Sequence, residues 1–207
     1  MKIVKKNIET NIVEKKSKFI ANVFYVENIE EAEEKIKMIK KKYYDAKHNC
    51  YAYRIIDDSN IIEKSSDDGE PSGTAGMPML DILKGNEICN IIVIVTRYFG
   101  GILLGTGGLV RAYSEVTNKV IKSSELVEIE EGYEIEVILD YKNYELFNYY
   151  CKKNNIYIVN KEYSENIKVI IEANEEKKEE ICRKSEKIKF ITLKSRILSK
   201  RLIRKIR

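Results

Sequence analysis

Two kinds of hydrophobic pattern follow one another along the first part of the chain. Residues 19–25 alternate as in a largely buried strand, and from Asn28 to Tyr43 apolar residues recur at the three- and four-residue spacing of a helix. Ile91–Val95 is an unbroken β-branched run, typical of a strand buried on both faces. The other elements predicted here are strands at 48–56 and 61–65 paired across a turn, helices at 77–84 and 109–120, and a strand or linker at 125–131.

A shorter cycle of the same patterns begins after Gly132. It predicts a strand at 133–141, a helix around 144–151, a hairpin of 156–163 with 167–173, a helix capped by Asn174 that runs to about 187, and a strand at 189–193. This β-α-β-β-α-β order is that of a ferredoxin-like domain. We therefore predict an α+β protein with a first domain at 1–130, a ferredoxin-like domain at 131–193 and a basic C-terminal tail at 194–207.

The tail changes the charge of the whole chain. The net charge is +4, but Lys194–Arg207 contains seven Lys and Arg residues (Lys194, Arg196, Lys200, Arg201, Arg204, Lys205 and Arg207) and no acid. Without it the body is slightly acidic, so bulk charge does not mark the body as a nucleic-acid binder. Two interpretations of the tail stay open: a basic amphipathic helix, or a disordered solubilising end.

Composition places the protein in a broad class. At 207 residues, 43% hydrophobic and 34% charged, the chain is expected to fold. No apolar run approaches the roughly 20 residues that span a bilayer, and the start lacks a signal-peptide pattern, so we expect a soluble cytoplasmic protein. The four cysteines lack the paired spacing of a zinc site and are expected to be buried thiols.

A glycine-rich segment between a strand and a helix is the first candidate site. Glycines let a ligand approach the backbone, amides at a helix N-terminus favour an anion, and two nearby arginines can bind phosphate. The segment is neither a Walker A loop nor a Rossmann fingerprint, and a tight structural connection is the alternative. The candidate anion- or nucleic-acid-binding residues are Arg97, Tyr98, Gly100, Gly101, Gly105, Thr106, Gly107, Gly108 and Arg111.

An acidic loop is the second candidate. Asp67, Asp68 and Glu70 could hold Mg²⁺ against a phosphate, and the alternative is a solvated turn; no other cofactor is expected. His48 shares a strand face with Cys50, but residues two apart on a strand point in parallel, so a packing or hydrogen-bonding role for His48 is favoured over catalysis. The supporting residues proposed for the site are His48, Asp67, Asp68, Glu70, Ser72 and Thr74.

Four separated motifs give the sequence a family likeness. They are Glu14–Phe19, His48–Tyr53, Asp67–Gly76, and Val95–Gly101 continued by Gly105–Tyr113. In this order they resemble the Impact/YigZ family. The resemblance implies a first domain with the fold of the second domain of ribosomal protein S5, related to domain IV of elongation factor G. It implies a second domain similar to that factor's domain V.

Three functions follow as hypotheses. The family likeness implies a role in the regulation of translation, with RNA, the ribosome or a translation-related protein as partner, and it brings no reaction with it. The leading hypothesis is therefore non-enzymatic binding through the glycine-rich surface. The alternatives are a Mg²⁺-dependent enzyme acting on a phosphorylated small molecule or nucleotide, and a protein adaptor that binds no nucleic acid.

Overall fold

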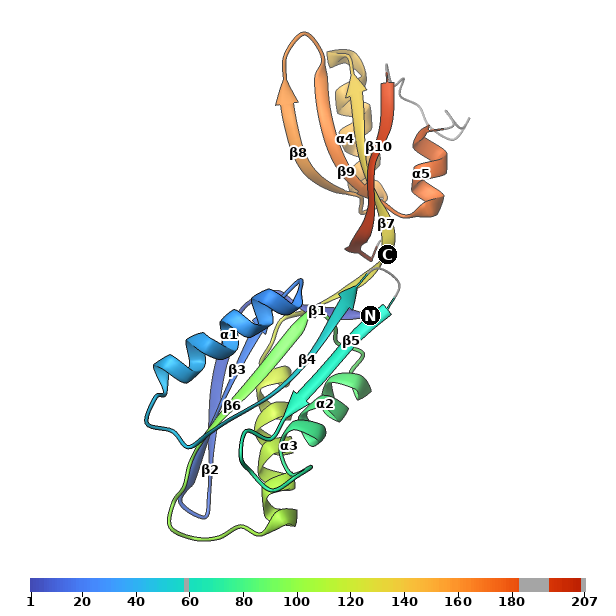
Figure 1. The fold of residues 1–207 in the computed structure, drawn as a ribbon. Coiled ribbons are helices and arrows are strands. Elements are labelled where there is room, and N and C mark those ends of the chain that lie inside the picture. The colour runs from blue at the N-terminus through green and yellow to red at the C-terminus, as the bar shows by residue number, and fades with distance from the viewer. Residues whose placement is uncertain (58–59, 183–193, 206–207) are drawn as a thin grey trace. The chain divides into compact units, whose positions relative to one another are not determined.

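The structure is a computed structural model that describes residues 1–57, 60–182 and 194–205. The chain divides into two compact units, Met1–Val127 and Glu128–Arg207, and both mix helices with antiparallel sheet (Figure 1). The α+β, two-domain prediction is confirmed. No helix among the described residues is both long and apolar enough to cross a bilayer.

The first unit is built on a five-stranded sheet in the order β2-β3-β6-β4-β5. Its strands are β2 (Ile8–Glu14), β3 (Ser17–Tyr25), β4 (His48–Asp57), β5 (Asn60–Ser66) and β6 (Ile91–Tyr98), and its helices are α1 (Ile29–Lys42), α2 (Gly76–Gly85) and α3 (Thr106–Lys122). A short strand, β1 (Lys2–Val4), hydrogen-bonds through Lys2 to the backbone of Glu87 and Cys89. The first unit thus confirms most of the predicted elements and adds β1 and β2.

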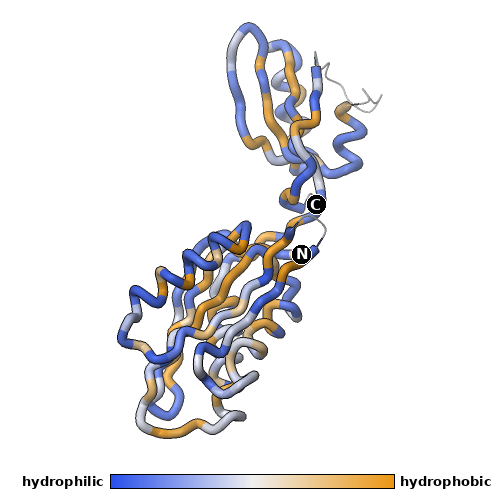
Figure 2. Tube along the Cα trace, in the orientation of Figure 1, coloured by the Kyte–Doolittle hydropathy of each residue, from blue (hydrophilic) through white to orange (hydrophobic). Residues whose placement is uncertain are grey.

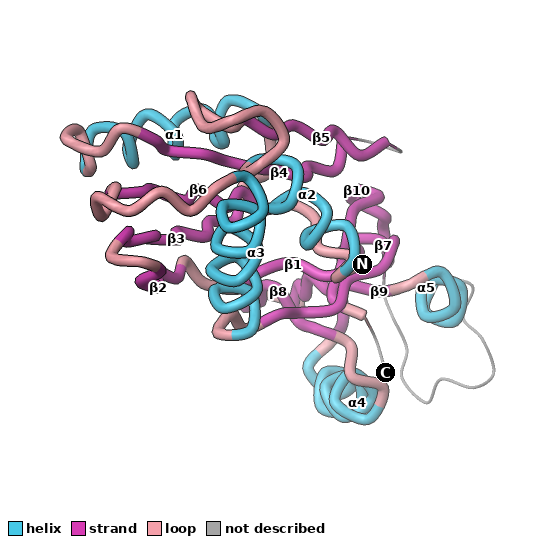
Figure 3. Tube along the Cα trace, turned by 90° about the horizontal axis from the view of Figure 1, so that it is seen from below, coloured by secondary structure: helices cyan, strands magenta, loops and turns pink. Residues whose placement is uncertain are grey.

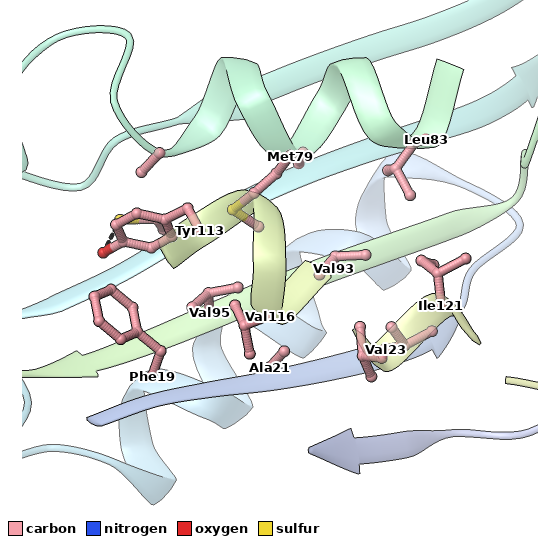
Figure 4. Close-up of a cluster of buried hydrophobic side chains, with 14 of the residues drawn as sticks. Phe19, Ala21, Val23, Met79, Leu83, Val93, Val95, Tyr113, Val116 and Ile121 are labelled. Atoms are coloured by element: carbon pink, nitrogen blue, oxygen red, sulfur yellow. Dashed lines mark hydrogen bonds between the residues drawn. The ribbon is translucent and has the colours of Figure 1, made fainter. Parts of the chain in front are cut away.

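Both faces of this sheet are covered by helices (Figure 3). On one face, Val93 and Val95 of β6 join the core formed with α2 and α3; on the other, Ile92 and Ile94 pack with residues of α1. Figure 4 shows the first of these cores, with Tyr113 of α3 over Phe19 of β3. The central, doubly buried strand predicted from the β-branched run is confirmed.

The second unit has the strand order β10-β7-β9-β8, with every neighbouring pair antiparallel. Its elements are β7 (Leu126–Leu139), α4 (Tyr141–Lys153), β8 (Tyr157–Tyr163), β9 (Ile167–Ala173), α5 (Glu175–Cys182) and β10 (Lys194–Arg204). The order β-α-β-β-α-β is the ferredoxin-like one. Asn174 caps α5 as predicted, accepting a hydrogen bond from the Lys177 N–H at 3.0 Å.

The basic tail is the main correction to the predicted organisation. Residues 194–204 form neither a helix nor a disordered end but the strand β10, which pairs with β7 and buries Ile203. Arg196 and Arg201 form ion pairs with Glu136 and Glu172 of the neighbouring strands. The strand predicted at 189–193 and the end of its preceding helix lie outside the described residues.

The junction between the two units also differs from the prediction. The segments predicted as a strand or linker at 125–131 and a strand at 133–141 are one continuous strand, β7, which ends at Leu139. The division after Val127 falls just before the predicted boundary. Cys50, Cys89 and Cys151 are buried thiols, as expected, and Cys182 is half-buried.

Candidate functional site

The candidate residues gather at one end of the first unit's sheet. We call this the hairpin end; it comprises the β2–β3 turn at Lys15 and Lys16, the loop 67–76, and the loop 99–105 that leads into α3 (Figure 1). Strand register brings these parts together, because Lys18 lies opposite Tyr98 and His48 lies opposite Arg97. The two loops that the sequence singled out therefore belong to one region.

Arg97 is not available to an external anion. Its side chain is only 7% exposed, and its Nη1 donates to both carboxylate oxygens of Glu70, at 2.7 and 3.0 Å. Its Nε is buried and makes no hydrogen bond within the described residues. A buried charge must be paired, and here Glu70 provides the partner. The predicted phosphate ligand is thus an internal counter-ion.

The ion pair continues into a buried polar network. The Tyr113 hydroxyl donates to Glu70 Oε1 at 2.9 Å, and the Cys50 thiol lies 3.2 Å from that hydroxyl and 2.9 Å from the Asp67 carbonyl oxygen. Burial raises the pKa of the Cys50 thiol to about 12 and also raises the pKa of Tyr113. At neutral pH both groups stay protonated, so Cys50 is a hydrogen-bonding residue rather than an activated nucleophile.

The hydrogen-bond partner of His48 lies in the acidic loop. A nitrogen of its imidazole, Nδ1, lies 2.9 Å from the Asp68 carbonyl oxygen. The hydrogen-bonding role favoured from the sequence is the one that the structure shows.

The acidic loop is organised around the Asp67 carboxylate. It accepts hydrogen bonds from the backbone N–H groups of Gly73, Ala75 and Gly76, each at 2.9 Å. Burial alone would raise the pKa of Asp67, but the three donors outweigh it and the pKa is lowered. Asp67 therefore closes the loop at the start of α2.

The other acidic side chains have separate partners. Asp68 accepts from the Asn49 N–H and from Lys40 Nζ, both at 2.7 Å, while Glu70 binds Arg97. Among the described residues no three His, Cys, Asp or Glu side chains converge as metal ligands. The three carboxylates proposed for Mg²⁺ therefore bind separate internal donors and do not converge on one point.

The supporting residues Ser72 and Thr74 differ in exposure. Thr74 is buried, and its hydroxyl donates to the Pro71 carbonyl oxygen at 2.6 Å, which tightens the loop. Ser72 is exposed at the loop surface. Of these two, only Ser72 faces solvent.

Much of the glycine-rich segment has a structural role. The Gly100 N–H donates to the Ser17 hydroxyl at 3.1 Å, and a Cβ at Gly100 would lie 2.0 Å from the Lys16 carbonyl carbon. Gly108 packs against Leu104. The Tyr98 hydroxyl donates to Asp45 at 2.7 Å, which raises the pKa of Tyr98 to about 12. Close packing, rather than ligand approach, explains Gly100.

The start of α3 keeps the features expected of an anion site. Gly105 is its N-cap residue, with φ of 72° and no capping side chain, and Gly101, Thr106 and Gly107 are exposed. Arg111, also exposed, lies beside this turn, since its Nη1 would be 3.9 Å from a Cβ at Gly107. An uncapped helix N-terminus with exposed residues, and one arginine beside it, is therefore present here.

The comparisons with known proteins match both units. Residues 15–121, more than half of the chain, match the Impact N-terminal domain, and residues 137–184 match a domain of unknown function, DUF1949. The chain belongs to the IMPACT family. An IMPACT family member of Haemophilus influenzae is 38% identical over 165 residues, which cover 78% of this chain and 79% of the relative.

Other IMPACT family relatives match over a shorter range. The family member YvyE of Bacillus subtilis is 47% identical over 125 residues, and the match spans 57% of its length. YigZ of Escherichia coli is 44% identical over 110 residues, or 53% of its length. A crystal structure described as a hypothetical protein is 30% identical, with a TM-score of 0.63, and covers 88% of this chain and 89% of that one.

Within the Impact N-terminal domain, the structure exposes residues that sequence reasoning did not assign. Lys15, Lys16 and Lys18 are exposed at the β2–β3 turn. Phe99, Ile102 and Leu103 are 57%, 43% and 82% exposed. In the sequence, the lysines form a short run and the apolar residues lie between glycines. Only the fold shows that these residues are exposed.

Proposed function

We propose that this member of the IMPACT family is a translation-associated regulatory protein that binds RNA through the hairpin end. The observation that carries the proposal is a group of four exposed cations, Lys15, Lys16, Lys18 and Arg111, at the end of the unit that also presents the start of α3. None of the four forms an ion pair with a described residue, whereas Arg97 is neutralised by Glu70. Unpaired surface cations are the groups that neutralise phosphates.

Phosphate contacts account for how this surface would bind. Lysines at the β2–β3 turn would neutralise the RNA backbone, and Arg111 with the backbone amides of α3 would bind a further phosphate. These contacts read no base sequence, so they give affinity and orientation. Translation is the setting that the family likeness implies.

The test is RNA binding as a function of salt concentration. We would measure fluorescence anisotropy of a labelled RNA stem-loop with single-stranded tails against the full chain, the double variant Lys15→Ala/Lys16→Ala, and Arg111→Ala. Each variant should bind roughly 3- to 10-fold more weakly near 0.1 M salt, and the slope of log K against log salt should become shallower by about 0.7 for each lost phosphate contact.

The matched control keeps the same change in net charge. Lys6 precedes β2 and Lys122 ends α3, so both lie toward the opposite end of the sheet; both are exposed, and neither forms an ion pair with a described residue. Lys6→Ala/Lys122→Ala should bind as the wild type does. If the lysine-turn, Arg111 and control variants all bind equally, the hairpin end is not the RNA site.

A further inference from the structure

Phe99 is an exposed aromatic residue with one face of its ring supported. It follows directly after β6 and is 57% exposed. The guanidinium carbon of Arg97 lies 5.7 Å from the centroid of this ring and 5.4 Å from the centroid of the buried Phe19 ring. Arg97 thus contacts both rings, and Phe99 is the outer one.

The support beneath Phe99 is fixed by buried contacts. Arg97 donates twice to Glu70, and Glu70 accepts a further hydrogen bond from Tyr113 of α3. Phe19 and Tyr113 in turn pack edge to face with ring centroids 5.2 Å apart. Because these groups are buried and hydrogen-bonded, the Arg97 guanidinium has a fixed position beneath the Phe99 ring before any ligand arrives.

Cations lie next to this ring. The residue after it, Gly100, packs directly on the backbone of Lys16 and hydrogen-bonds Ser17, so the β2–β3 turn sits against the start of the loop. Figure 2 shows the hydrophobic stretch of the β6–α3 loop close to the hydrophilic turn of the β2–β3 hairpin. The turn that carries Lys15 and Lys16 therefore borders the loop that begins with Phe99.

We infer that Phe99 is a stacking platform for an unpaired base, so that the RNA bound at the hairpin end is single-stranded or a loop rather than a duplex. This inference rests on the proposed function. An aromatic ring beside lysines matches the surfaces that bind single strands, where bases stack on side chains while cations follow the backbone. Bases inside a duplex are stacked on both faces and cannot stack on the ring.

A protein partner is the competing occupant. Ile102 and Leu103 add exposed apolar surface to the same loop, and an apolar protein segment would contact it without needing an aromatic ring. The Arg97 guanidinium beneath the ring and the lysine-bearing turn beside the loop favour a base and a phosphate. Substitutions at Phe99 distinguish the two, because leucine preserves apolar contact and loses stacking, whereas tryptophan preserves stacking.

The experiment uses the full chain and two labelled RNAs of equal length, an unstructured single strand and a duplex. The single strand also carries 2-aminopurine, whose fluorescence is quenched when it stacks. The wild type and Phe99→Trp should bind the single strand about 10-fold more tightly than the duplex and quench the probe. Phe99→Leu should lose roughly 10-fold in single-strand affinity, together with the quenching.

Tyr149→Leu is the matched control, since Tyr149 is a 67% exposed aromatic residue of the second unit; it should behave as the wild type. Equal thermal melts of all variants would exclude misfolding as the cause. If Phe99→Leu binds both RNAs as the wild type does while Lys15→Ala/Lys16→Ala weakens both, the platform is overturned and the proposed function stands. If the wild type binds neither RNA, the stacking platform and the proposed function are both overturned.

Discussion

The Arg97–Glu70 pair determines how substitutions at the hairpin end should be interpreted. Both side chains are less than 10% exposed, so removing one partner leaves a buried, uncompensated charge. We expect Arg97→Met or Glu70→Leu alone to lower the free energy of unfolding by about 3–5 kcal/mol. In the double variant Arg97→Met/Glu70→Leu the loss should be smaller than the sum of the two by at least about 2 kcal/mol.

Urea unfolding of the four proteins measures this coupling. Additive losses would mean that the two side chains do not depend on each other in the folded state. Lost RNA binding by an arginine variant would in any case be uninformative until its stability is known, because Arg97 acts from inside the protein.

At this scale the sequence groups residues that the fold brings together, but it does not predict which of them are buried. An arginine at a strand end before a glycine loop is typical of a phosphate ligand, and the sequence does not show that Glu70, 27 residues away, faces it. Arg111 is exposed because it falls outside the face of α3 that Leu109, Ala112 and Tyr113 bury. Burial decides between the two arginines, and burial is a property of the fold.

At the scale of the elements, two glycines make a matched pair. A methyl group at Gly100 would meet the Lys16 backbone, while nothing lies within 4 Å of a Cβ at Gly85, at the end of α2. Gly100→Ala should therefore separate the loop from the β2–β3 turn and cost roughly 2 kcal/mol or more. Gly85→Ala should be neutral or stabilise by up to about 1 kcal/mol.

Thermal unfolding of both variants provides the measurement, with amide hydrogen exchange at the β2–β3 turn as a local readout. Faster exchange there is expected only for Gly100→Ala. Unchanged exchange in that variant would show that the loop and the turn are not held together through Gly100.

The elements found from the sequence are those with the strongest hydrophobic patterns. β3, β6, α1 and α3 bury continuous apolar faces, so their periodicity is clear. β2 and β10 are edge strands whose residues are mostly exposed and polar, and β10 resembles a basic tail because its cations pair with acids on strands far away in sequence. Partners of this kind leave no local pattern.

For the whole molecule, the separate cores imply separate folding units. The buried clusters of the first unit contain only residues up to Leu126, and that of the second contains only residues from Tyr133 onward. We expect the fragment 1–127 to fold and to retain RNA binding within about three-fold of the full chain. The four cations proposed to bind RNA, Lys15, Lys16, Lys18 and Arg111, all lie in this fragment.

Circular dichroism melts and anisotropy titrations of fragments 1–127 and 128–207 would test this expectation. If the RNA affinity of the full chain were found in 128–207 instead, the interface would have to be placed in the second unit. The ferredoxin-like order of that unit was predictable because it follows from the sequence of elements alone, although its last strand lies farther along the chain than the pattern indicated.

The pairing of β10 with β7 bears on how shortened forms of the protein behave. A chain ended after residue 193 would lose the antiparallel partner of β7 between Ile129 and Ile138. The backbone N–H and C=O groups so exposed form a template on which another copy can add a strand, which is a common origin of aggregates. Insolubility of such a truncated chain would reflect an opened sheet edge rather than the loss of a basic appendage.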